Sequence, residues 1–186
     1  MIKKWNNIIT IYQSNKMSKQ SLINIVLYKP EIPYNTGNII RSCATFTSNL
    51  HLIRPYGFFI NDKRMIRAST DYLNQINLFE HDDFQSLLNS IDENDLIYFL
   101  TKKGESRPDE INFNFNQNKK IYLVFGQETN GLPEEILNKY KNQTIRIPIS
   151  NESRCLNLSN SVACLLYEIY RQNNFKDLGI NYEIAK

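Results

Sequence analysis

The sequence has little cysteine, glycine and proline, and it has no long hydrophobic run. Its three cysteines, Cys43, Cys155 and Cys164, lie far apart without a CxxC spacing, so neither a disulfide framework nor a structural metal site is predicted. Six glycines and six prolines argue against a collagen-like or disordered chain. The longest apolar runs, 121–125 and 162–166, fall far short of the roughly 18 residues that span a bilayer, so we expect no membrane association.

The first residues also lack the features of a secretory signal, namely a charged start, an apolar stretch and a small-residue cleavage site. Unpaired cysteines are typical of a reducing compartment. Both observations predict a cytoplasmic protein. Residues 1–21 are rich in Lys and Asn, and we interpret them as an N-terminal extension of unknown role that precedes the folded body.

The rest of the composition is that of one ordinary globular domain. The 186 residues are 41% hydrophobic, 22% charged and 12% aromatic, and a chain of this length buries roughly 70% of its unfolded surface in a single core. The net charge of +3 reflects lysines within residues 1–21 and says little about the body.

One stretch of the body is locally basic. Five side chains are opposed there in sequence only by Asp62: His51, Arg54, Lys63, Arg64 and Arg67. Such a cluster is a candidate phosphate-contacting surface, although a solvated helix face would explain the same residues.

Strand-like and helix-like patterns alternate along the body. Apolar runs typical of strands occupy 24–28, 50–54, 75–79, 95–101, 120–126 and 143–148, and helical patterns occupy 35–46, 82–91, 133–140 and 156–173. Alternation of this kind predicts an α/β fold, with a mostly parallel sheet and helices on both faces. Ligands bind such sheets beyond the carboxyl ends of the strands, which directs attention to the loops after Tyr28, Thr101, Gly126 and Pro148.

Three of these loops have unusual sequences. In the first, Asn35 and Thr36 are possible caps of a helix that carries Arg41 about two turns later, and the free amides of a helix start suit an anion or ribose oxygens. A capped surface helix with a solvent-exposed arginine would explain the same residues. An arginine can fork onto a phosphate or orient a hydroxyl group.

The second loop ends a hydrophobic strand with two glycines, Gly126 and Gly131, which permit close backbone approach to a ligand. A GxGxxG fingerprint is absent, and no Lys-Ser or Lys-Thr follows Gly131, so an NAD or NTP site is not indicated. Glu128 lies at the strand tip, where it suits a functional role or complements the dipole of a helix opened by Pro133.

The third loop, 150–156, leads into the last amphipathic helix. Asn157, Ser159 and Asn160 follow one another at the start of that helix. Asn and Ser favour helix caps, but three such residues exceed what one cap requires.

Together the segments NTGNIIR (35–41), FGQETNGL (125–132) and IRIPISNESRCLNLSN (145–160) resemble the three motifs of the SPOUT methyltransferases that methylate ribose 2′-hydroxyls of tRNA. Within that family, the segments INIVLYKPEIPYNTGNIIR (23–41) and DKRMIRASTDY (62–72) are most similar to the members that act on cytidine or uridine 34 in the anticodon loop. The resemblance covers about residues 22–175 and leaves 176–186 as a tail.

The resemblance implies a fold, a cofactor and an assembly. It implies that the C-terminal part forms a deep trefoil knot, that S-adenosylmethionine binds there, and that the enzyme is a homodimer whose site uses both chains. In the family, backbone atoms hold most of the cofactor. The matching positions are Leu100, Gly126, Ile147, Cys155 and Leu156.

The resemblance also implies residue roles. Arg41 matches the arginine proposed to activate the ribose hydroxyl, and Asn35, Glu128 and Asn157 match polar residues of the catalytic site. The expected RNA contacts are Lys63, Arg64, Arg67 and His51. Three positions depart from the family pattern: Gln127 replaces an expected Pro or Ser, Cys155 an expected Ser, and Thr47 an expected Gly.

Other functions remain open from the sequence. A cysteine-nucleophile enzyme would use Cys155, but no His or Asp in the same motif would generate its thiolate. A non-catalytic RNA-binding module would use the basic stretch 51–67 without needing the cofactor. Methylation at another tRNA or rRNA ribose is the third alternative.

Overall fold

The structure is a computed structural model that describes residues 8–12, 21–115 and 119–179. Its strands are β1 (Ile8–Tyr12), β2 (Ile23–Tyr28), β3 (Asn49–Ile53), β4 (Leu78–His81), β5 (Leu96–Leu100), β6 (Ile121–Phe125) and β7 (Thr144–Ile145). Its α-helices are α1 (Pro33–Thr45), α2 (Lys63–Ser69), α3 (Phe84–Leu88), α4 (Glu134–Lys139) and α5 (Leu158–Gln172). Short 3-10 helices occupy Thr70–Gln75, Pro108–Glu110 and Lys141–Gln143.

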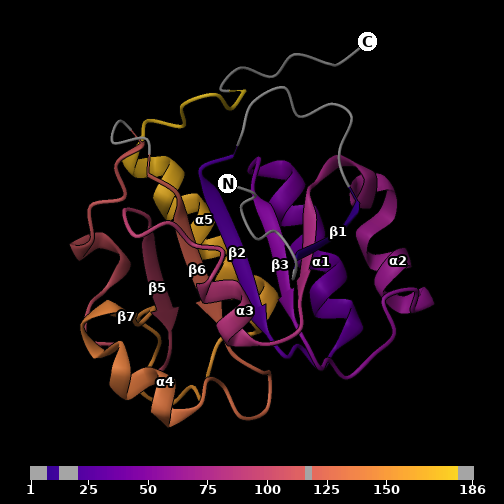
Figure 1. Ribbon diagram of the computed structural model, residues 1–186. Helices are drawn as coiled ribbons and strands as arrows, with labels where there is room; N and C mark the ends of the chain where they lie inside the picture. Colours follow the sequence, from indigo (N-terminus) through magenta and orange to yellow (C-terminus); the bar gives the residue numbers. More distant parts are fainter. Residues whose placement is uncertain (1–7, 13–20, 116–118, 180–186) are drawn as a thin grey trace, which may run out of the picture.

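All seven strands form one sheet in the order β1-β4-β3-β2-β6-β5-β7 (Figure 1). Every pairing from β4 to β7 is parallel, and only β1 runs antiparallel, along β4. The six predicted strands and the mostly parallel sheet are therefore confirmed. Strand β1 has no counterpart among the predicted strands, and it lies within residues 1–21, which the sequence suggested to be an extension.

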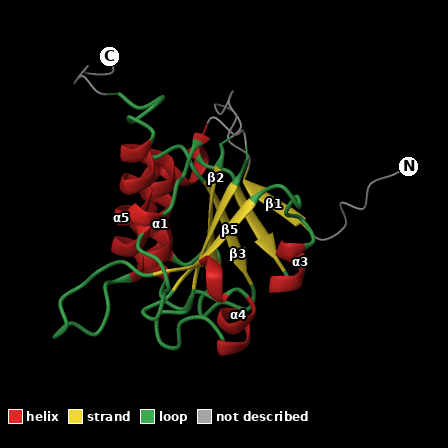
Figure 2. Cartoon of the chain, turned by 90° about the vertical axis from the view of Figure 1, so that its left-hand side faces the viewer, coloured by secondary structure: helices red, strands yellow, loops and turns green. Residues whose placement is uncertain are grey.

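Helices cover both faces of the sheet, as predicted. Figure 2 shows α1 and α5 side by side against one face, with α3 and α4 on the other. The first face buries Ile25, Leu50 and Leu123 against Ile39 of α1, Met65 of α2 and Leu165 of α5. The second face buries Val26, Phe99 and Val124 against Leu87 of α3 and the side chains of α4. A two-sided apolar cover explains why the central strands are almost wholly buried.

Helix α1 begins earlier than the sequence patterns predict, and its predicted caps are wrong. The helix begins at Pro33, a residue whose fixed φ and missing N–H suit the first helical position, and no side chain caps it at Ile32. Asn35 and Thr36 lie inside the first turn and are buried. The side chain of Asn35 is therefore free to make contacts outside its own helix.

Candidate active site at the carboxyl edge of the sheet

The second and third motifs follow β6 and β7, which flank β5 at the carboxyl edge of the sheet, and the first motif follows β2, the other neighbour of β6. The strand register places Leu100 opposite Phe125 on one side and opposite Ile145 on the other. The next residues along β6 and β7 begin the Gly126 loop and the Ile147 loop. The positions predicted to hold the cofactor on these three strands thus share one edge, at the arrowhead ends in Figure 1.

The loop after β6 folds back tightly on itself. The backbone N–H groups of Gln127 and Gly131 donate to each other's carbonyls at 3.0 and 2.9 Å. A Cβ on Gly126 would lie 2.2 Å from the carbonyl carbon of Gly131, and Gly131 itself has a φ of 68°. Both glycines are therefore required by the turn, because a side chain would collide at one and strain the backbone at the other.

The backbone of 144–146 is enclosed from two sides. The amide of Thr101 donates to the Ile145 carbonyl at 3.0 Å, and the amide of Arg146 donates to the Ser106 carbonyl at 2.9 Å. A Cβ on Gly104 would lie 2.2 Å from the carbonyl carbon of Ile145. The chain that leaves β5 thus bends around the segment 144–146, so that this segment has β5 on one side and residues 104–106 on the other.

Beyond Arg146 the backbone no longer forms these hydrogen bonds with the chain around β5. Among the described residues, the amide and carbonyl groups of Ile147, Cys155 and Leu156 form no hydrogen bond with another backbone group. They lie on an exposed or half-exposed segment. A cofactor held mainly through backbone atoms needs free groups of this kind, so the predicted residues fit S-adenosylmethionine.

Three predicted polar residues meet in one hydrogen-bonded chain. The Nδ2 of Asn157 donates to the Oδ1 of Asn35 at 3.1 Å, and the Nδ2 of Asn35 donates to Glu128 at 3.0 Å. Each comes from a different motif, and the strand order places them together. The carboxylate of Glu128 acts as the acceptor at the end of the chain.

Glu128 also holds the start of α1. It accepts hydrogen bonds from the backbone amides of Glu31 and Ile32 at 2.8 and 3.2 Å. In return, Glu31 accepts from the amide and hydroxyl of Thr129 at 3.1 and 2.7 Å. The sequence left open whether Glu128 has a functional role or complements the helix after Pro133, and the structure shows its carboxylate bound to the start of α1.

Asn157 has two roles in the structure. It is the N-cap of α5, since its Oδ1 accepts from the amides of Ser159 and Asn160 at 2.9 and 3.4 Å. Its amide nitrogen contacts Asn35 of α1. The surplus of Asn and Ser in this motif is explained by a cap that is also part of the polar chain.

Arg41 lies outside this polar chain. It is exposed on α1 with its guanidinium carbon 5.9 Å from the ring centroid of Tyr72. Tyr34 and Asn38 precede it at helical spacing and are also exposed. Arg41 thus presents its charge on an open face of α1.

The predicted RNA-contacting residues separate into different environments. Lys63, Arg64 and Arg67 lie exposed on α2, which packs against α1 where Gly37 has no room for a Cβ. Arg64 is bound to the carboxylate of Asp62 at 2.8 Å, whereas Lys63 and Arg67 form none of the ion pairs seen in the described part of the chain.

His51 does not belong to that surface. Its side chain lies in the sheet, 6% exposed, with Nδ1 2.9 Å from the Nε2 of His81 and Nε2 3.2 Å from the Oδ1 of Asn24. Burial, with His81 and Lys120 nearby, lowers its pKa well below the usual value. The sequence-based assignment of His51 to the RNA surface is wrong for this reason.

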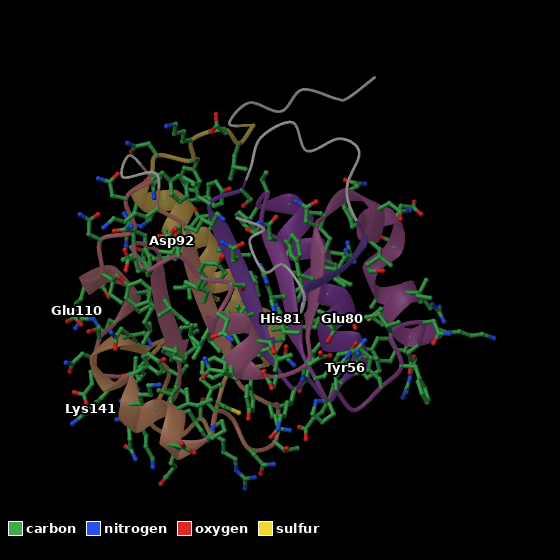
Figure 3. All side chains as sticks on the ribbon, in the orientation of Figure 1. Tyr56, Glu80, His81, Asp92, Glu110 and Lys141 are labelled. Atoms are coloured by element: carbon green, nitrogen blue, oxygen red, sulfur yellow. The ribbon has the colours of Figure 1, made fainter. Side chains whose placement is uncertain are left out.

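Arg54, which extended the basic stretch in sequence, is paired as well. Its guanidinium binds the buried carboxylate of Glu80 and lies 3.6 Å from Asp82. Tyr56 donates to the same Glu80 at 2.6 Å, and burial together with this bond raises the pKa of Tyr56 to about 12. Figure 3 shows Tyr56, Glu80 and His81 on the same side of the molecule. The acids that neutralise Arg54 come from β4 and its following loop.

The described residues contain neither a membrane-spanning helix nor a metal-binding group of side chains. No helix across 8–12, 21–115 and 119–179 is long and apolar enough to cross a membrane. In the same part of the chain, histidine, cysteine and carboxylate side chains form no group of three able to hold a metal. Cys155 is exposed, and both histidines lie buried on β3 and β4.

The chain is similar to known proteins over most of its length. A model of the SpoU rRNA Methylase family matches residues 22–167. A protein of Mycoplasma pneumoniae named as a tRNA (cytidine(34)-2′-O)-methyltransferase is 50% identical over 159 residues, which cover 86% of this chain and 96% of that protein.

Two solved structures share the fold. One, described as giving insight into 2-OH methylation of C/U34 on tRNA, has a TM-score of 0.77 and 37% identity, and the match covers 83% of this chain and 97% of that chain. The other is an AdoMet-bound rRNA methyltransferase of Sinorhizobium meliloti, with a TM-score of 0.72 and 20% identity over 86% of this chain and 60% of that one. The second likeness concerns the fold alone.

Proposed function

This chain belongs to the SpoU rRNA methylase family, and we propose that it methylates the ribose 2′-hydroxyl of nucleotide 34, a cytidine or uridine, in tRNA with S-adenosylmethionine as methyl donor. The observation that carries this proposal is the hydrogen-bonded chain from Asn157 through Asn35 to Glu128, which joins all three motifs and begins directly after Leu156. Relatives that cover most of this chain carry the same activity in their names.

Methyl transfer requires residues that hold the methyl donor and residues that keep the loops of the site aligned. When bound, S-adenosylmethionine would supply an electrophilic methyl group on its sulfonium; in-line attack by the ribose oxygen would form the C–O bond as the C–S bond breaks, with release of the thioether and of the hydroxyl proton. The backbone at Leu100, Gly126, Ile147, Cys155 and Leu156 holds and orients the donor. The Asn157–Asn35–Glu128 chain keeps α1 and α5 in register, so that the loops they carry stay aligned.

Arg41 acts on the acceptor in this proposal. A guanidinium carries several donors in a rigid fork and has no acceptor site, so it orients the ribose oxygen and an adjacent phosphate without serving as an acceptor of the hydroxyl proton. Its exposed position on α1 leaves the fork accessible to RNA. The 2′-hydroxyl of an unstacked anticodon nucleotide is reachable without melting a duplex.

We also propose that the C-terminal part is knotted. The backbone of 144–146 is hydrogen-bonded to β5 on one side and to Ser106 on the other. A trefoil knot requires the chain to thread through a loop, and the position of 144–146 between β5 and the loop that leaves it supports this proposal. Knotted chains are rare in proteins, so general rules of chain topology would not have predicted one here.

The proposed assembly is a homodimer in the cytoplasm that docks through α1 and α5. These two helices lie side by side, and each presents a large exposed ring, Tyr34 at 49% and Tyr167 at 55% exposure. Arg41 lies on the same exposed side of α1 as Tyr34. A second copy covering these rings would bring its own residues close to Arg41. Light scattering at micromolar concentration should give twice the chain mass of 21.9 kDa.

The direct test is nucleoside analysis. Purified protein is incubated with unmodified tRNA and S-adenosylmethionine. One part of the RNA is digested to nucleosides and examined by mass spectrometry for 2′-O-methylcytidine and 2′-O-methyluridine, and another part is cut into ribonuclease fragments whose masses locate the methyl group. We expect one methyl group on the ribose of nucleotide 34. A methyl group on a base, or on a ribose elsewhere in tRNA or in rRNA, would overturn the substrate, and cofactor binding without any methylation would favour a binding module.

A further inference from the structure

The loop that connects β3 to α2 carries an aromatic side chain pointing into solvent. Phe59 is 81% exposed, the highest exposure among the large hydrophobic residues of the described segments. Its neighbour Phe58 is 9% exposed and packs with its ring centroid 5.4 Å from that of Tyr56. Successive residues of this loop therefore point in opposite directions, one into the core and one outward.

The outward position of Phe59 is held by the loop and does not result from a loose chain. The amide of Gly57 donates to the Pro30 carbonyl at 2.9 Å, and the amide of Asp62 donates to the carbonyl of Phe59 itself at 2.8 Å. Asp62 then caps α2 through the amide of Arg64. With both ends of the turn and the adjacent Phe58 anchored, the Phe59 ring stays exposed at little further cost in conformational entropy.

This loop is in contact with the candidate active site. A Cβ on Gly57 would lie 3.0 Å from the Cα of Glu31, so the two segments pack backbone to backbone. The amide of Glu31 is bound by Glu128 at 2.8 Å. Phe59 is therefore two residues from a contact with the segment that carries the Asn35 motif.

Basic side chains border the same loop. Lys63 and Arg67 are exposed on α2, at helical spacing on one face, and form none of the ion pairs found in the described part of the chain. Arg64, between them, is bound to Asp62. The surface thus combines an exposed ring with two free cations beside a site proposed to act on RNA.

We propose that Phe59 stacks on an unpaired base adjacent to the methylated nucleotide, while Lys63 and Arg67 contact the phosphates of the same strand. The proposal rests on the RNA methyltransferase function proposed above and adds the residue that holds the flanking base. Single-stranded RNA is held through aromatic rings that stack on bases and cations that follow the backbone. A phenyl ring has no hydrogen-bonding group, so the contact tolerates any base.

The test compares Phe59→Ala, Phe59→Trp and the control Ile66→Ala, which removes a neighbouring side chain that is apolar and 45% exposed but has no aromatic face. The probe is an anticodon stem-loop RNA with 2-aminopurine next to nucleotide 34. We expect wild-type protein to quench its fluorescence by stacking, and Phe59→Ala to lose the quenching and bind about 5- to 100-fold more weakly. Phe59→Trp and Ile66→Ala should stay within about threefold of wild type.

Further readouts separate stacking from structure and charge. Phe59→Ala should raise KM for RNA and leave kcat, cofactor binding by calorimetry and the salt dependence of RNA binding unchanged, because no charge is removed. Unaltered RNA affinity in Phe59→Ala would overturn the inference. A particle mass of Phe59→Ala that differs from that of wild type in light scattering would also overturn it, because the ring would then contact a second protein chain.

The two proposals fail in different ways. If wild-type protein methylates nucleotide 34 and Phe59→Ala behaves identically, only the stacking role falls. If wild-type protein methylates another nucleotide and Phe59→Ala raises KM for that RNA, the stacking role stands and the proposed substrate position falls.

Discussion

The side chains of Asn35 and Asn157 are joined by a hydrogen bond of 3.1 Å although 122 residues separate them in the chain. The bond is directional, because Asn157 donates its amide nitrogen and Asn35 then donates its own to Glu128 at 3.0 Å. Asn157 uses its oxygen for a different purpose, the N-terminal amides of α5. One residue thus ties the start of α5 to the start of α1.

The two roles of Asn157 are separable by mutation. Asn157→Ala removes both, so we expect the free energy of unfolding to fall by about 1 kcal/mol from the lost cap. Asn157→Asp keeps a capping oxygen but replaces the donor with a carboxylate facing Asn35 and Glu128. We expect near-normal stability in urea unfolding with methyl transfer slowed about tenfold or more. Full activity in Asn157→Asp would show that the contact with Asn35 is not needed.

Substitutions of Arg41 test whether its guanidinium orients the ribose 2′-hydroxyl. Arg41→Ala should slow methyl transfer by roughly 100-fold or more with cofactor binding nearly intact, since the interaction forms mainly in the transition state. Arg41→Lys keeps a positive charge but lacks the fork, so it should recover little. Single-turnover rates and calorimetry with S-adenosylmethionine give the two measurements. A fully active Arg41→Ala would contradict the mechanism.

The exposed cations of α2 should contribute to the salt dependence of RNA binding. Lys63→Gln and Arg67→Gln should each reduce the slope of log affinity against log salt by about 0.7 to 0.9, because each releases one fewer counterion. Arg64→Gln is the matched control, since its guanidinium is already bound to Asp62 and its loss should change the slope less. Equal slopes for all three variants and wild type would refute the assignment.

Thr47 occupies a position where its backbone is strained. It follows α1 with a φ of 46°, a left-handed conformation that is costly for a β-branched residue. Thr47→Gly should raise the free energy of unfolding by about 0.5–1 kcal/mol in urea titrations. The same change at Thr45, the last residue of α1 and also exposed, should lower it. Equal effects at both positions would contradict this explanation.

The buried histidine pair predicts acid sensitivity. Burial lowers the pKa of His81 to about 4 and that of His51 well below its usual value. An unfolded histidine binds a proton near pH 6.5, so between about pH 6.5 and pH 4 the unfolded state binds more protons than the folded state. The free energy of unfolding should therefore fall as the pH falls through this window.

Unfolding titrations at several pH values check this expectation. His81→Gln removes one of the two titrations, so its stability should depend less steeply on pH than that of wild type between about pH 4 and 6.5. Carboxylates contribute equally to both proteins and cancel in the comparison. Parallel pH profiles would show that the pair does not titrate as its burial requires.

Local patterns in the sequence determined the order and type of the main elements. The apolar runs at 24–28 and 120–126 became β2 and β6, and the helical period at 156–173 became α5 with Asn157 as its cap. These features depend on neighbours within a few residues, which periodicity and capping preferences report directly. The sequence patterns did not predict the short helix α2 or the edge strand β1, because neither has a long periodic pattern.

The sequence also placed the three motifs at the carboxyl edge of the sheet, but only the tertiary structure decided which side chains meet. Glu128 contacts Asn35 because β2 and β6 are adjacent, an order that no local pattern reports. His51 and Arg54 looked like surface cations, yet β4 supplies His81 and Glu80 as their partners. Pairing across neighbouring strands sets burial and charge, because residues distant in the chain then determine the solvation of each side chain.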